Sequence, residues 1–71
     1  MADSVYKFIE LVGTSSESWE KAAAAAVTQA SKSVRDLRVA EIVQLDVAIE
    51  NGKIKSYRAK VKLSFKIESK G

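Results

Sequence analysis

The 71-residue chain has no cysteine, no histidine and no proline, and it has only three glycines. Without cysteine it cannot form a disulfide, and without cysteine and histidine it offers no thiolate or imidazole ligand to zinc. The same absences exclude Ser-His and Cys-His nucleophile pairs and an imidazole general base. Three scattered glycines exclude a glycine-rich phosphate-binding loop. The composition therefore excludes much of the usual catalytic chemistry.

Long apolar runs are also lacking. No stretch approaches the ~20 residues of a membrane-spanning helix. The N-terminal segment MADSVYK lacks the apolar core of a signal peptide, so we expect a cytoplasmic protein. The length fits one small domain, residues 1–71, with a net charge of +3. Although 46% of the residues are hydrophobic, many are alanines that bury little area. Because so small a core stabilises a lone domain only marginally, we expect the chain to form oligomers.

Three strands are indicated by β-branched and aromatic residues. We predict them over residues 5–12, 39–50 and 53–68. Asn51-Gly52 separates the last two, and this dipeptide favours the type I′ turn of a tight hairpin. Together with one helix, the strands form an α+β unit of order β-α-β-β. If the third strand lies between the others, the sheet is antiparallel throughout.

The single helix is expected to begin in the serine-rich segment after Gly13. We place its N-cap at Ser15, whose side-chain oxygen can accept a hydrogen bond from a free amide of the first turn. The helix closes within residues 34–38. Helical spacing places Trp19, Ala22, Ala23, Ala26, Ala30 and Val34 on one face. This face should pack on the sheet, with Trp19 as a core residue.

The hairpin fixes a predicted register for the last two strands. A two-residue loop pairs Glu50 with Lys53, Leu45 with Arg58 and Glu41 with Lys62. An apolar stripe then remains on the sheet face away from the helix, made of Val39, Val43, Leu45, Val47 and Ile49. Soluble monomers rarely leave such a stripe exposed, so we expect self-association to bury it.

The chain resembles the dodecins from about Val5 to Glu68. The resemblance rests on VYKFIELVGTSSESWEKAAAAAV, on SVRDLRVAEI, on the hairpin turn and on the ending VKLSFKIE. It implies a three-stranded antiparallel sheet wrapped around one helix, and a hollow homododecamer built from trimers. Dodecins bind riboflavin or FMN at subunit junctions. They store and buffer these flavins and are not enzymes.

The resemblance also places the family's flavin-site positions on Val39, Gln44, Arg58 and Lys66. Flavin-binding dodecins carry at the position of Val39 a tryptophan that stacks on the flavin ring, and valine has no π face. They carry glutamine at the position of Arg58, where arginine can only donate hydrogen bonds. Flavin binding should therefore be weakened or lost. Lys66 keeps the positive charge that serves ligand phosphates in dodecins.

Val39 and Arg58 instead resemble the calcium dodecin branch, which has the same shell without the flavin tryptophan. Calcium prefers several oxygen ligands, and Glu41 and Asp46 are the candidate carboxylates for a site shared between subunits. Alternatively, both carboxylates are solvated partners of Lys62 or Arg58. We predict that Arg58 forms a structural ion pair with Glu41 or Asp46 of a neighbouring subunit. A shell with a purely structural role is a further alternative.

Nucleic-acid binding is the third class considered. Four basic residues of the third strand share one face: Arg58, Lys60, Lys62 and Lys66. A protein surface that binds single-stranded nucleic acid needs aromatic side chains between such basic residues. Tyr57 and Phe65 of the same strand fall on the opposite face, so nucleic acid is not the expected partner.

Overall fold

The computed structural model describes residues 4–67 as one sheet and one helix. Strand β1 (Val5–Ser15) precedes helix α1 (Trp19–Ser31), and strands β2 (Leu37–Glu50) and β3 (Lys53–Ile67) follow. The strand order is β1-β3-β2, and both pairings are antiparallel. The predicted α+β class and strand order are therefore confirmed. The predicted last residue of the third strand, Glu68, lies outside the described range. Within that range, α1 is too short and too polar to cross a membrane.

The helix begins at a different serine from the predicted one. Ser18 is the N-cap, and its side-chain oxygen accepts a hydrogen bond from the Lys21 amide at 3.0 Å. Ser15 instead ends β1, because the pairing with β3 continues beyond Gly13 as far as Ser15↔Tyr57. The Ser15 hydroxyl still accepts from the Glu17 amide at 3.0 Å. Both serines thus satisfy amides of the connection into the helix.

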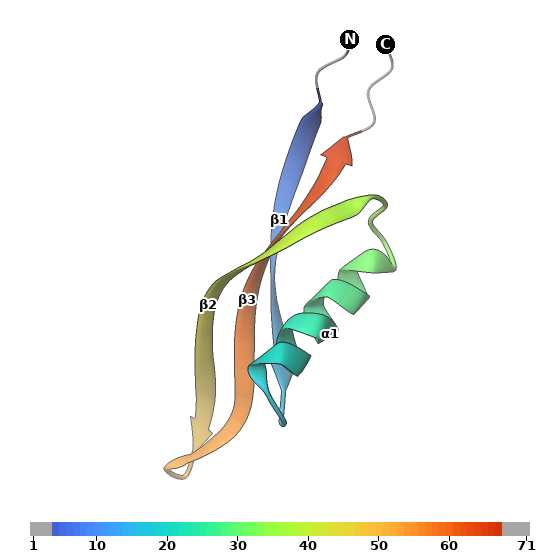
Figure 1. Ribbon diagram of the computed structural model, residues 1–71. Helices are drawn as coiled ribbons and strands as arrows, with labels where there is room; N and C mark the ends of the chain where they lie inside the picture. Colours follow the sequence, from blue (N-terminus) through green and yellow to red (C-terminus); the bar gives the residue numbers. More distant parts are fainter. Residues whose placement is uncertain (1–3, 68–71) are drawn as a thin grey trace.

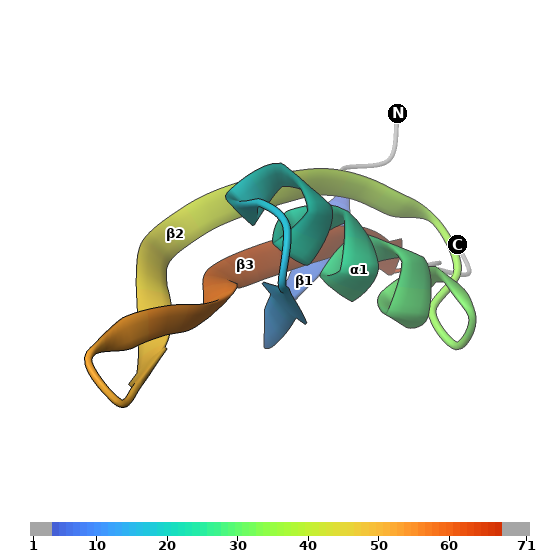
Figure 2. The ribbon, with the colours of Figure 1, turned by 90° about the horizontal axis from the view of Figure 1, so that it is seen from below.

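The alanine face of α1 packs on the concave side of the sheet, as predicted. Figure 2 shows the sheet curving around the helix, with β2 arching past it. The buried core consists of Ala22, Ala26 and Ala30 from α1 and Ala59, Val61 and Leu63 from β3. The helix approaches β1 so closely that a Cβ on Gly13 would lie 1.9 Å from the carbonyl oxygen of Ala22. Small side chains are therefore required at this contact.

The hairpin turn has the predicted geometry, but the register beyond it differs. Asn51 and Gly52 both have positive φ, at 54° and 74°, as a type I′ turn needs. Pairing starts at Glu50↔Lys53, as predicted, and then shifts by one residue between Ala48 and Ile49. Asp46, rather than Leu45, consequently lies opposite Arg58. A second shift, between Ile42 and Gln44, restores the predicted pairing of Glu41 with Lys62.

Because of these shifts, some side chains of β2 lie on the other face of the sheet from the predicted one. Leu45 and Val47 lie opposite Ala59 and Tyr57, so they share the helix side of the sheet. The prediction that both face away from the helix is wrong, because one extra residue in β3 inverts the alternation. Leu45 is nevertheless 49% exposed, because α1 packs mainly on β1 and β3. The expected exposure of apolar residues on β2 is therefore present, with Val39 on the predicted face, opposite Ser64, and Leu45 on the helix side.

Candidate functional site

An ion pair lies at the middle of the sheet on the face away from α1. Arg58 of β3 is directly opposite Asp46 of β2, and the Arg58 Nε donates a hydrogen bond to Asp46 Oδ1 at 2.8 Å. The two side chains are 46% and 39% exposed. Asp46 was one of the two predicted partners, but the pair forms within one chain and does not require a neighbouring subunit. Arg58 thus has a carboxylate that fixes its orientation.

A small cavity of about 130 Å³ surrounds this ion pair, lined by Val12, Gln44, Asp46, Arg58 and Lys60. It brings together three of the predicted site residues: Gln44, Asp46 and Arg58. The Gln44 amide can donate and accept, whereas the two cationic side chains only donate. Lys60 Nζ is 3.9 Å from Glu10 Oε1 on β1, so its charge is partly balanced. This cavity can hold a small polar or anionic group.

Trp19 connects the start of α1 to the ion pair. Its indole Nε1 donates to the backbone carbonyl oxygen of Asp46 at 3.0 Å. Its ring meets Tyr57 edge-on, with centroids 5.0 Å apart and planes at 72°. Trp19 is 39% exposed, so the prediction that it belongs to the core is wrong. The indole instead holds β2 to the helix beside Asp46. Sequence reasoning missed this contact because only the fold brings the indole to β2.

Val39 and Glu41 lie farther along β2. Val39 is opposite Ser64, six residues from Arg58 along β3, or about 20 Å at the usual strand rise. Within one chain, Val39 is therefore not brought together with Gln44 and Arg58, which share the small cavity. Glu41 lies opposite Lys62, as predicted. Across residues 4–67 no three carboxylates gather into a metal-binding cluster.

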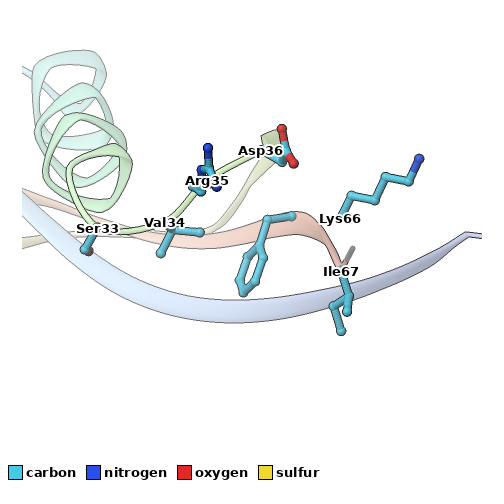
Figure 3. Close-up of a pocket in the computed structure, with 7 residues that line it drawn as sticks. Ser33, Val34, Arg35, Asp36, Lys66 and Ile67 are labelled. Carbon is cyan, nitrogen blue, oxygen red and sulfur yellow. The ribbon is translucent and has the colours of Figure 1, made fainter. Parts of the chain in front are cut away.

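Lys66 lines a second and larger cavity, of about 760 Å³, beside the α1–β2 connection. Arg35, Asp36 and Lys66 extend to the same side in Figure 3, whereas Ile67 points to the other. The Lys66 amide donates to the Asp36 carbonyl oxygen at 3.4 Å, which joins the connection to the end of β3. Asp36 has a left-handed backbone, with φ of 59°. Arg35 is a second cation here that sequence reasoning missed, since only the fold brings it to Lys66.

Comparisons with known proteins agree with this fold. The family model described as Dodecin matches residues 5–68. A calcium dodecin of Mycobacterium tuberculosis is 52% identical over 65 residues, with 90% of each chain covered. The crystal structure of a calcium-chelating calcium dodecin from the same organism has 46% identity and a TM-score of 0.82, covering 96% of this chain and 97% of its own. Dodecin from Streptomyces coelicolor has 34% identity and a TM-score of 0.90, covering 99% of this chain and 100% of its own. The chain therefore belongs to the dodecin family.

Proposed function

We propose that this chain is the subunit of a cytoplasmic dodecameric shell that binds and stores a small molecule, without catalysis. We further propose that its flavin affinity is weak. The observation that carries this proposal is the ion pair at 2.8 Å between Arg58 and Asp46. It holds a cation where the resemblance to flavin dodecins implies an amide for the ring edge. Val39, at the position of the stacking tryptophan, is 61% exposed and aliphatic, so it cannot stack on a ring.

Self-association is supported by apolar side chains that one chain leaves uncovered on β2 and the hairpin. Five of them are between 44% and 67% exposed: Ile42, Val43, Leu45, Ile49 and Ile54. Burial is worth about 25 cal/mol per Å² of apolar surface, so covering these side chains would add substantially to a small core. A closed symmetric assembly covers them without leaving a free edge.

The absorption spectrum of the purified assembly tests the flavin part of this proposal. We expect no visible flavin band, and only slight quenching of riboflavin fluorescence on titration with the protein. A yellow protein, or strong quenching at low micromolar riboflavin, would contradict the assignment. Light scattering on the same sample tests the shell separately.

Calcium binding is a second candidate function, favoured by the 52% identity to a protein named calcium dodecin. Asp46 and Glu41 share the sheet face away from α1, since both oppose even-numbered β3 residues on that face. Carboxylates of several subunits could complete the oxygen coordination that calcium requires. Isothermal titration should show calcium binding that Asp46→Asn and Glu41→Gln both weaken. Binding that neither variant changes would exclude these two residues as ligands.

The cavity at Lys66 suits an anionic group of the stored molecule. Arg35 and Lys66 supply two positive charges against the one carboxylate of Asp36, and the apolar lining comes from Val34, Phe65 and Ile67. Pyrophosphate is a simple probe for this role. Lys66→Gln should weaken its binding in a calorimetric titration, whereas Lys53→Gln, at the opposite end of β3, should not. Equal binding by both variants would remove Lys66 from the site.

A further inference from the structure

The β2–β3 hairpin extends beyond the rest of the sheet. Strand β1 ends at Ser15, which lies opposite Tyr57, so among the described residues the part of β3 before Tyr57 pairs only with β2. Residues 48–56 therefore form a two-stranded hairpin arm, which Figure 2 shows projecting past β1 and α1. Because a two-stranded hairpin is marginally stable by itself, the direction of this arm depends on what supports the point where it leaves the sheet.

Trp19 supports that point from the helix. It is the first residue of α1, and its indole Nε1 donates a hydrogen bond to the Asp46 carbonyl oxygen at 3.0 Å. Its ring meets the Tyr57 ring edge-on, with the two centroids 5.0 Å apart. Asp46 lies on β2 and Tyr57 lies on β3, both next to the arm. The Trp19 side chain therefore contacts both strands where the hairpin arm begins.

The buried core does not reach the hairpin arm. Its contribution from β3 starts at Ala59, beyond Tyr57 as seen from the arm. The contact between Trp19 and Tyr57 thus carries the packing of helix on sheet past the core, to the last row that contains all three strands. Inside the arm, the extra residue Lys55 bends β3, because a bulge bends and twists its strand. A fixed direction of the arm therefore requires a fixed starting point, which Trp19 provides.

The hairpin arm carries an exposed pair of apolar side chains. Ile49 and Ile54 lie opposite each other and are 67% and 57% exposed. Covering them with a second copy of this chain is favourable by about 25 cal/mol per Å² of apolar surface. A surface that is already ordered loses less conformational freedom on association than a mobile one. An arm that Trp19 holds in one direction can therefore associate with a smaller loss of entropy than a free arm.

We propose that Trp19 is a positioning residue, which holds the hairpin arm in the direction at which a second copy of this chain covers Ile49 and Ile54. This role rests on the proposed self-association and names the contact that prepares the subunit for it. It requires no ligand and no surface that stays free in the shell. If Trp19 only stabilised the subunit, its loss would affect unfolding and dissociation of the assembly alike.

Urea titrations of the intact assembly separate these two roles. Light scattering gives the midpoint of dissociation, and far-ultraviolet circular dichroism gives the midpoint of subunit unfolding. Trp19→Phe removes the indole donor but keeps a ring, and it should lower the dissociation midpoint more than the unfolding midpoint. The difference should be roughly 0.5–1 M urea, the shift that one lost hydrogen bond gives in a small protein. Tyr57→Leu removes the edge-on contact and should act in the same direction.

Leu11→Ala is the matched control, because Leu11 packs against the buried core and lies on β1, which does not enter the hairpin arm. It should lower both midpoints together. Parallel shifts in Trp19→Phe and Tyr57→Leu, or no shift in either, would overturn the role of Trp19 and leave the shell proposal standing. Unfolding of both variants without urea would overturn it too, since Trp19 would then hold the subunit itself. Native protein that scatters as a monomer would refute the shell, and this role with it.

Discussion

Asp46 lies directly opposite Arg58 across β2 and β3, and its Oδ1 accepts a hydrogen bond from the Arg58 Nε at 2.8 Å. This pairing exists because the β2–β3 register shifts by one residue near the hairpin. Without the shift, Leu45 would face the guanidinium. The Asp46 carbonyl oxygen also accepts a hydrogen bond from the Trp19 indole, so helix, strand and ion pair meet at one residue.

Replacing Arg58 by alanine should destabilise the protein modestly. Half-exposed ion pairs contribute at most about 1 kcal/mol, so we expect a small drop in the melting temperature. A double-mutant cycle with Asp46→Ala should give a coupling energy of about 0.5 kcal/mol. Lys55→Ala is the matched control, because its pair with Glu50 spans 3.5 Å and both side chains are 62% exposed. If Arg58→Ala leaves stability unchanged while abolishing binding of a phosphate-bearing ligand, Arg58 is a ligand residue.

Gly13→Ala should destabilise the fold strongly. The added Cβ would meet the Ala22 carbonyl oxygen at 1.9 Å, so α1 would have to move off β1. Overpacking of this kind costs about 1–3 kcal/mol or more, measurable by urea denaturation. Gly52→Ala is the control, since a Cβ there meets no atom within 4 Å and only the backbone at φ 74° is strained. An equal or larger loss in Gly52→Ala would contradict the close contact.

Leu45→Lys or Val43→Lys should break the assembly into smaller species. Both residues are exposed in one chain, at 49% and 44%, and a lysine would bring a charge into an apolar interface. Gln29→Lys, on the exposed surface of α1, is the control and should leave the mass unchanged. Light scattering measures the mass of the assembly for all three variants. An unchanged mass for both β2 variants would place the interface elsewhere.

Val39→Trp combined with Arg58→Gln should raise riboflavin affinity. The first change adds an aromatic surface, and the second replaces a cation with an amide that can both donate and accept. One ring stack is worth about 1–3 kcal/mol by analogy with nucleobases, so affinity should rise at least about fivefold. Riboflavin fluorescence quenching measures the gain. Equal quenching by the native protein would show that neither position governs flavin binding.

The strands, the helix and the hairpin could be predicted because each depends on local pattern. Asn51-Gly52 fixes its turn by conformational preference, and the alanine spacing fixes the buried helix face. The extra residue of β3 is Lys55, which lies between the pairs Ala48↔Ser56 and Ile49↔Ile54. It could not be predicted, because Lys55 looks like any other residue of an alternating strand. The sheet face predicted for Leu45 and Val47 was wrong for that reason alone. Ser15 and Ser18 are equally good caps by sequence, and only the length of the β1–β3 pairing decides between them.

The candidate site was predictable only in part. Gln44, Asp46 and Arg58 do meet at one cavity, but Val39 lies well away along the same sheet. A site that joins both positions would need a second chain, and the fold of one subunit does not show that chain. Arg35 joins Lys66 through the α1–β2 connection, a contact that no sequence spacing reveals.

Native mass spectrometry, combined with the visible absorption spectrum of the same sample, tests most directly whether the protein forms a dodecameric shell without bound flavin. We expect an assembly of about twelve times the 7.7 kDa chain mass, as membership of the dodecin family implies, and no flavin absorption. A dominant monomer at micromolar concentration, or a shell that carries stoichiometric flavin, would contradict the account.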